Sequence, residues 1–332
     1  MKQRIAKWDN AKFVLILLVV IGHFLDYYET ENALFQWGFL WIYSFHIPAF
    51  LFLSGLMSQK SLRSNHFSIR RIGAYLVFYL MCNGLDALVR LVLRQPIDLC
   101  LWGQDHYSWF MIVLPVFLLA TRLLRKLPAG LMIPITMVVG CLAGYSNHIG
   151  DVFFLSRILA LYPFFLMGFY WNHQTLFAHL QKWYIKLFSL VVVVGSMAVS
   201  YLYLDELYFL RPLFTARNCY ENIDLPTIWG GVYRLGWYAG ALILLLAFLS
   251  VMPNIQSFIT VWGSRTLQVY VLHRPLLRLL IGIGLGSGLQ TLLPVWWEIP
   301  YVLTAVALTM VLSIRWLEPP FSVFLNSKKK GK

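Results

Sequence analysis

The chain has 332 residues, of which 59% are hydrophobic and only 12% are charged. Soluble globular domains carry about 25% charged residues, so this composition excludes most soluble folds, and its high hydrophobicity also excludes a disordered chain. The formal net charge of +13 does not indicate a nucleic-acid partner, because no basic run alternates with exposed aromatic residues. The composition therefore favours a membrane protein.

Ten apolar segments follow one another along the chain, each bounded by polar or turn residues. Because a helix needs about 20 apolar residues to cross a bilayer, ten crossings with short loops would use most of the sequence. The segments fall at about 12–29, 34–57, 72–93, 108–121, 129–146, 153–171, 185–204, 228–251, 266–286 and 297–316. This pattern predicts an all-α polytopic membrane protein of about ten transmembrane helices. We expect one domain over residues 1–332, embedded over about 9–316 and ending in a basic cytoplasmic tail at 317–332.

Basic and acidic residues are distributed unequally among the loops of this arrangement. Most Lys and Arg residues lie at the two termini and in the loops on the same side of the membrane, whereas most Asp and Glu residues lie in the opposite loops. In multi-pass proteins the loops rich in Lys and Arg stay in the cytoplasm. The sequence therefore predicts that both termini are cytoplasmic.

The first apolar segment carries ionisable residues on one face. Lys12 and His23 are eleven residues apart, which places them within about 20° of each other on a helix and about 16 Å apart along its axis. Asp26, three residues further on, can accept a hydrogen bond from the imidazole. Ionisable groups at membrane depth are costly and are kept where they pair or line a cavity. The alternative is a structural histidine between helices, with Lys12 as an interfacial anchor.

Two more histidines are expected near the middle of the membrane. His46 precedes Pro48 in the second segment, and His273 precedes Pro275 in the ninth. A proline removes a backbone donor and kinks a helix, which favours a cavity wall beside each histidine. The alternative is that these prolines serve packing alone, as they often do in membrane helices.

Two other features are interpreted as structural. In the structural alternative for the second segment, the dipeptide Ser54-Gly55 forms a close crossing between membrane helices. Asp86 and Arg90 are four residues apart in the third segment and can form an ion pair on one helix face.

A basic cluster lies between the second and third segments, beside the end of the first segment that carries Lys12. It consists of Lys60, Arg63, Arg70 and Arg71. Two interpretations stay open, because such a cluster can bind lipid head groups or hold the phosphates of a soluble cofactor. No group of His, Cys, Asp and Glu residues has the spacing of metal ligands, so no metal is expected.

Five motif blocks stand in order along the chain. They are Asp9, Lys12, Val19, Val20, Gly22 and His23; Phe45, His46, Pro48, Phe50, Ser54 and Gly55; Trp109-Phe110-Met111; Ser156, Arg157, Pro163, Phe164, Phe165 and Gly168; and Gly263, Thr266, Leu267, Tyr270, His273 and Pro275. Over about residues 9–275 the chain thereby resembles the acyltransferase type 3 family of integral membrane acyltransferases, in the branch of fucose 4-O-acetylase-like and surface-glycan O-acetyltransferases. One departure is Lys12, where the family more often has Arg.

The resemblance implies a membrane O-acyltransferase, in the simplest case an O-acetyltransferase, in the plasma (inner) membrane. It would move an acetyl group from cytoplasmic acetyl-CoA to a hydroxyl of a cell-surface polysaccharide or lipid-linked sugar. His23 would be the general base, oriented by Asp26, and His46 would polarise the thioester or position the acceptor. The residues expected to hold CoA phosphates are Lys12, Lys60, Arg63, Arg70 and Arg71, and those expected on the acceptor side are His273, Arg157, Trp109 and Tyr270. The expected partners are this acceptor and membrane lipids, with homo-oligomerisation left open.

Two other classes of function compete with the enzyme. A proton-coupled transporter or flippase of a glycan or small polar solute would use buried histidines to relay protons and would not bind CoA. A membrane scaffold would only bind partners and would tolerate replacement of its histidines by Leu or Phe. The resemblance favours the enzyme over both.

Overall fold

The computed structural model describes residues 5–64, 67–97, 107–149, 152–223 and 227–321. Within these ranges the regular elements are helices, as the sequence predicts, and no strand occurs. The predicted basic tail lies outside the described residues from residue 322 onward.

Each of the ten predicted segments coincides with a helix. The longer helices are α1 (Ala6–Leu25), α2 (Ala33–Arg63), α3 (Ile69–Val92), α4 (Phe110–Leu124), α5 (Ala129–Ala143), α6 (Leu155–Tyr170), α8 (Trp183–Leu202), α11 (Gly230–Val251), α13 (Thr266–Gly282) and α15 (Glu298–Leu312). Shorter elements connect them: η1 (Tyr107–Trp109), α7 (His173–Leu180), α9 (Leu204–Leu207), η4 (Tyr208–Leu210), α10 (Arg211–Phe214), α12 (Phe258–Trp262) and α14 (Leu285–Leu292).

Six of these helices are long and apolar enough to cross a membrane, namely α1, α2, α3, α4 with η1, α8 and α11. The number rises to eight if α13 with α14, bent by 53°, and α15 with the turn that follows it, bent by 61°, each count as one span. The chain is therefore a multi-pass membrane protein with six to eight candidate spans among the described residues. Two of the ten predicted segments, α5 and α6, have only 15 and 16 residues and are short for a crossing.

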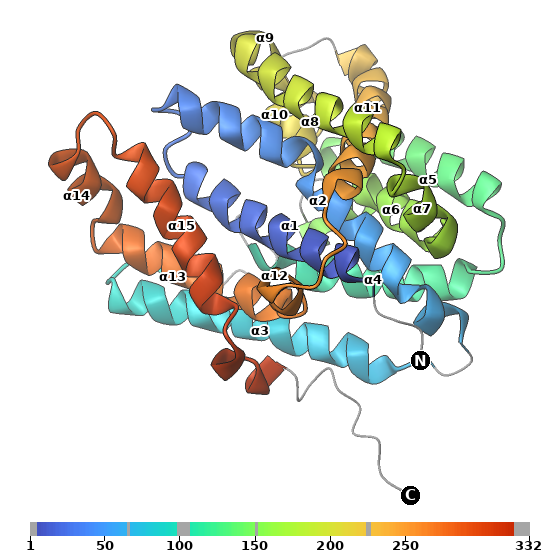
Figure 1. The fold of residues 1–332 in the computed structure, drawn as a ribbon, viewed down its shortest axis with the longest axis horizontal. Coiled ribbons are helices and arrows are strands. Elements are labelled where there is room, and N and C mark those ends of the chain that lie inside the picture. The colour runs from blue at the N-terminus through green and yellow to red at the C-terminus, as the bar shows by residue number, and fades with distance from the viewer. Residues whose placement is uncertain (1–4, 65–66, 98–106, 150–151, 224–226, 322–332) are drawn as a thin grey trace, which may run out of the picture.

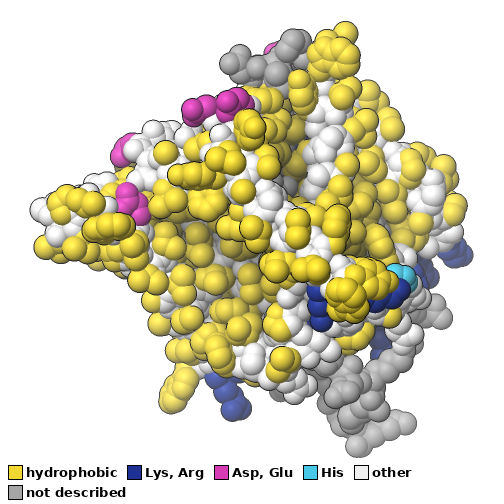
Figure 2. Space-filling view, turned by 45° about the horizontal axis from the view of Figure 1, so that its top comes forward, with side chains coloured by type: hydrophobic (Ala, Val, Ile, Leu, Met, Phe, Trp, Pro, Cys, Tyr) yellow, Lys and Arg dark blue, Asp and Glu magenta, His cyan; other side chains and the backbone are white. Residues whose placement is uncertain are grey.

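Charged side chains are segregated on the surface. Figure 2 shows acidic side chains toward one end of the molecule and Lys and Arg side chains toward the opposite end, with a broad hydrophobic surface between them. This distribution matches a protein embedded in a bilayer with two chemically different ends. The side of the membrane on which the termini lie stays a prediction.

α1 lies in the middle of the bundle (Figure 1) and packs against α2, α12, α13 and α15. Polar residues at its start are paired inside the protein: Lys7 Nζ donates to the Ser250 carbonyl at 2.7 Å, and Asn10 Nδ2 donates to the Pro253 carbonyl at 2.9 Å. Because buried polar groups are costly without partners, these bonds fix the rotation of α1 about its axis.

α2 and α6 cross in close backbone contact. A Cβ atom at Gly55 would lie 2.0 Å from the Phe165 carbonyl oxygen, and one at Gly168 would lie 1.9 Å from the Phe52 carbonyl oxygen. Neither position has room for a side chain, so the predicted small-residue crossing at Ser54-Gly55 is confirmed. The crossing holds α6 against α2, and α6 contributes Arg157 and Leu161 to the second cavity described below.

Asp86 joins α3 to α13. Its carboxylate accepts a hydrogen bond from Arg90 Nε at 2.9 Å and another from Arg278 Nε at 2.7 Å. The ion pair predicted between Asp86 and Arg90 is thus confirmed, and Arg278 adds a second partner from a distant part of the sequence. Two guanidiniums on one carboxylate make a charge-assisted link that sets α13 beside α3.

Candidate active site

One face of α1 lines two cavities in succession. Lys12, Ile16 and Val19 line the first cavity, and His23 and Asp26, at the end of the helix, line the second. The spacing of four, three, four and three residues keeps these side chains on one face, because an α-helix has 3.6 residues per turn. The structure therefore places the predicted stripe from Lys12 to His23 along the walls of internal space.

The first cavity, which we call the Lys12 cavity, has a volume of about 390 Å³. Two cations, Lys12 and Arg71, belong to its lining, and the rest is apolar or carries hydroxyl groups. Its other lining residues are Ile16, Val19, Ile47, Phe50, Leu53, Ser54, Met57, Ser58, Tyr75, Phe110, Met111, Leu114, Ser264, Thr266, Leu267 and Tyr270. A largely apolar space with two cations suits a ligand that has a neutral arm and a phosphorylated end.

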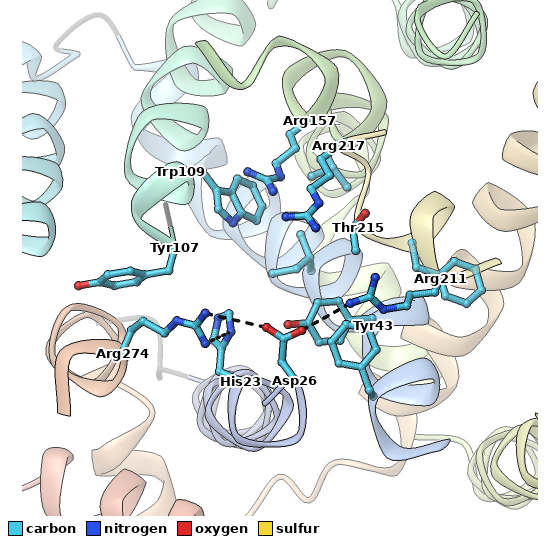
Figure 3. A pocket seen from close by; sticks show the side chains of 14 residues that line it. His23, Asp26, Tyr43, Tyr107, Trp109, Arg157, Arg211, Thr215, Arg217 and Arg274 are labelled. Carbon is cyan, nitrogen blue, oxygen red and sulfur yellow. Dashed lines mark hydrogen bonds and ion pairs between the residues drawn. The ribbon is translucent and has the colours of Figure 1, made fainter. Parts of the chain in front are cut away.

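The second cavity, which we call the His23 cavity, has a volume of about 170 Å³. Its lining is far more polar and includes four arginines. The lining residues are His23, Asp26, Phe39, Tyr43, Ile47, Tyr107, Trp109, Arg157, Leu161, Arg211, Phe214, Thr215, Arg217 and Arg274. Figure 3 shows how the polar members surround the space from several elements.

Ile47 on α2 belongs to the lining of both cavities. α1, α2, α13 and the η1–α4 segment also contribute residues to both. The two cavities are therefore consecutive along the bundle, with the Ile47 side chain between them.

His23 is partly buried at the wall of its cavity. Arg274 Nη1 lies 3.5 Å from His23 Nδ1, and because a guanidinium can only donate, the imidazole nitrogen is the acceptor. The His23 ring also stacks on the His273 ring, with the centroids 5.2 Å apart. The imidazole is thus held from two sides while it faces the cavity.

Asp26 lies between two arginines and does not turn back to His23. Its carboxylate oxygens are 3.7 Å from Arg211 Nη2 and 3.9 Å from Arg274 Nη2 (Figure 3). The sequence predicts a direct hydrogen bond from His23 to Asp26; the structure shows instead an indirect link in which Asp26 contacts Arg274 and Arg274 contacts His23. Asp26 follows the last residue of α1, where guanidiniums from α10 and α13 offer it stronger, charged partners.

A buried carboxylate fixes Arg211 from behind. Glu29 is 4% exposed and forms an ion pair with Arg211 Nη2. Burial raises the pKa of Glu29, while the Arg211 guanidinium acts in the opposite direction. Burial and the neighbouring Glu29 carboxylate also raise the pKa of Tyr208 to about 12. Arg211 is therefore positioned by Glu29 and reaches Asp26 only as a second, longer contact.

The other two predicted histidines lie behind the walls of these cavities. His46 is 4% exposed and its Nδ1 bonds to the Ile42 carbonyl at 2.7 Å, while His273 is fully buried and its Nδ1 bonds to the Tyr270 carbonyl at 2.8 Å. Neither belongs to the lining of the Lys12 cavity or the His23 cavity. His273 approaches the site through its stacking on His23.

The predicted basic cluster contributes Arg71 to the Lys12 cavity. Arg71 lines the Lys12 cavity together with Lys12, whose Nζ also forms an ion pair with Asp9 at 2.6 Å. Lys60, Arg63 and Arg70 are exposed and lie outside the cavity lining. Because α2 continues to Arg63, its last turn projects Lys60 and Arg63 beyond the end of the cavity.

The predicted acceptor-side residues are distributed between the two cavities. Arg157 and Trp109 both line the His23 cavity, with the guanidinium 4.8 Å from the indole centroid. Arg157 is only 6% exposed, so it is a buried residue of the cavity wall. Tyr270 lines the Lys12 cavity.

Three arginines that line the His23 cavity are not among the site residues predicted from the sequence. Arg211 and Arg217 come from the connection between α8 and α11, and Arg274 comes from α13. Two features of the sequence point to these arginines. The connection between α8 and α11 is long enough to line a site, and Arg274 is next to His273 and Pro275. That all three line the same cavity depends on tertiary packing. Among the described residues, no group of three or more His, Cys, Asp or Glu side chains is arranged to hold a metal ion.

The comparisons with known proteins agree with this architecture. The family profile described as an acyltransferase domain matches residues 5–314, which is nearly the whole chain. No curated protein and no solved structure matches. The matched region includes both cavities and every predicted site residue, and the chain belongs to the acyltransferase type 3 family of membrane transferases.

Proposed function

We propose that the protein is an acetyl-CoA-dependent O-acetyltransferase of the plasma (inner) membrane that acetylates a hydroxyl of a cell-surface polysaccharide or lipid-linked sugar. The observation that carries the proposal is the face of α1 that runs from Lys12 in one cavity to His23 in the next. Both termini are cytoplasmic, and residues 1–332 act as one domain. The family match favours this enzyme over a transporter or a scaffold.

Acetyl-CoA enters the Lys12 cavity from the cytoplasm. The CoA phosphates lie near Lys12 and Arg71, with Lys60, Arg63 and Arg70 at the entrance, where charge-assisted contacts favour phosphate. The apolar lining beyond these cations receives the uncharged pantetheine arm. The rise of α1 from Lys12 to His23 is about 16 Å, a distance that this arm bridges, so the thioester reaches Ile47 and the imidazole.

The acceptor occupies the His23 cavity, with Arg157 and Trp109 at its wall. His23 removes the proton from the acceptor hydroxyl as the oxygen attacks the thioester carbon. The new C–O bond forms, the C–S bond breaks, and the CoA thiolate leaves and takes up the proton from the imidazolium. Asp26 keeps Arg274 in contact with the imidazole, and His273 supports the ring from behind. Tyr270, in the lining of the Lys12 cavity, positions the thioester, and His46 supports the α2 wall from behind.

The decisive experiment is His23→Gln, measured as acetyl transfer from radiolabelled acetyl-CoA to a membrane glycan fraction. Transfer should fall by at least about 100-fold, since general base catalysis contributes about 10²–10⁴, while acetyl-CoA binding is retained. His179→Gln is a matched control, because His179 is an exposed histidine on α7. Undiminished transfer by His23→Gln would remove His23 from the mechanism.

A further inference from the structure

The His23 cavity is unusual in its charge. Its lining contains four guanidiniums, those of Arg157, Arg211, Arg217 and Arg274, and a single carboxylate, that of Asp26. Glu29, which holds Arg211 from behind, adds a second carboxylate close by. A sugar recognised through its hydroxyl groups alone needs no such set, because neutral hydroxyls are bound well by mixed donors and acceptors, and guanidiniums can only donate.

The guanidiniums converge on the space beside His23 from three helices, α6, α10 and α13, and from the loop after α10 that carries Arg217. Figure 3 shows Arg157 and Arg217 across the cavity from His23 and Asp26, with Arg211 and Arg274 on either side of the Asp26 carboxylate. Arg157 and Arg217 each take part in another interaction as well. Since each guanidinium has five N–H donors, a partner elsewhere leaves donors that can face a ligand.

The contacts that Asp26 makes are long. Its oxygens lie 3.7 Å from Arg211 and 3.9 Å from Arg274, beyond the 2.7–2.9 Å that is typical of strong charge-assisted hydrogen bonds. Asp26 therefore sits between two cations at longer distances, and of these two Arg211 also has a close carboxylate partner in Glu29. A second anion in the cavity gains short hydrogen bonds that Asp26 does not make.

We infer that the acceptor carries a carboxylate or phosphate close to the hydroxyl that is acylated, and that Arg157, Arg211, Arg217 and Arg274 recognise this negative charge. The inference rests on the proposed function and narrows its substrate to an acidic or phosphorylated sugar. The cavity of about 170 Å³ is smaller than the roughly 300–1,000 Å³ of most ligand sites, so the anionic group and the hydroxyl belong to the same or adjoining sugar units.

The test measures binding to the purified full-length protein in nanodiscs of uncharged phosphatidylcholine. The probes are methyl β-D-glucuronide, methyl β-D-glucoside 6-phosphate and neutral methyl β-D-glucoside. All three have the same pyranose ring and differ only in the group at C6. At least one charged glycoside should bind about tenfold or more tightly than the neutral one, and the tighter of the two identifies carboxylate or phosphate as the group recognised.

Variants locate this preference within the cavity. Arg217→Gln should lose most of the preference without weakening the neutral glycoside, Arg217→Lys should keep part of it, and Arg94→Gln, at an exposed arginine outside the lining, should keep all of it. Equal affinities for the three glycosides, no binding of any of them, or an unchanged preference in Arg217→Gln would overturn the inference. Acetyl-CoA binding is measured on the same samples, and its absence would count against the proposed function and not against anion recognition.

Discussion

Asp26 shows what a sequence pattern predicts about a cavity-lining residue and what it misses. Helical periodicity correctly places Lys12, His23 and Asp26 on one face of α1. It does not predict the partner of Asp26, because that choice depends on Arg211 and Arg274, which lie far away in the sequence. Local spacing is enough to align groups, whereas ion pairing is decided by tertiary packing.

Asp26→Asn should lower kcat for acetyl transfer by up to about 100-fold, because the loss of its charge releases Arg274 from its place beside His23, and a displacement of about 1 Å near a reacting group can cost that much. The KM for acetyl-CoA should stay unchanged, since Asp26 lines the other cavity. Steady-state kinetics provide the measurement, with Asp205→Asn in the exposed part of α9 as the control. A normal kcat would show that Asp26 does not position the imidazole.

The two cations of the Lys12 cavity differ in how cleanly they can be tested. Lys12 is paired with the buried Asp9, so its removal disturbs folding as well as binding. Arg71→Gln avoids that difficulty and should raise the KM for acetyl-CoA about tenfold, the usual effect of losing about 1.4 kcal/mol of binding, with kcat nearly unchanged. Lys126→Gln, at an exposed position outside the cavity, is the control. An unaltered KM would place the CoA phosphates elsewhere.

At the level of elements, apolar runs predict which segments are helical but not where a helix breaks. The sequence predicts one helix over 266–286, whereas the structure ends α13 at Gly282 and begins α14 at Leu285. The break is at Gly284, whose φ of 90° is accessible to glycine with little strain. The sequence feature that indicates a helix break here is the row of four glycines at alternate positions from Gly282 to Gly288.

The α2–α6 crossing allows a prediction about stability. Gly168→Val should prevent this close approach, because even a Cβ atom would lie 1.9 Å from the Phe52 carbonyl oxygen, and the protein should lose its monodisperse state or melt at a much lower temperature. Gly195→Val on α8, where a Cβ atom meets nothing within 4 Å, should be tolerated. Size-exclusion chromatography in detergent with a thermal ramp would distinguish them, and equal behaviour would contradict the crossing.

For the molecule as a whole, hydropathy and charge predict the class of protein and its orientation, whereas the two consecutive cavities depend on how five or more helices meet. No spacing in the sequence predicts that Tyr43, Arg157 and Arg217 line the same space. The acidic and basic ends seen in Figure 2 fit the predicted orientation, since cytoplasmic loops carry the excess of Lys and Arg.

A green fluorescent protein fused to the C-terminus should therefore fold and fluoresce in the cytoplasm, and a tag at the N-terminus should be protected from protease in intact cells. A tag inserted after Asp205, in the acidic connection between α8 and α11, should be cleaved in the same cells. Protection of the inserted tag together with cleavage of the N-terminal tag would reverse the proposed orientation and the side from which acetyl-CoA enters.

Ile47 gives the architecture one further property. A single branched hydrocarbon side chain separates the space assigned to the donor from the space assigned to the acceptor. In the proposed reaction the carbonyl carbon of the donor and the hydroxyl oxygen of the acceptor meet beside this side chain. Under the proposed function, a hydrocarbon side chain at this point disfavours water and ions between the two cavities and so protects the activated donor from hydrolysis.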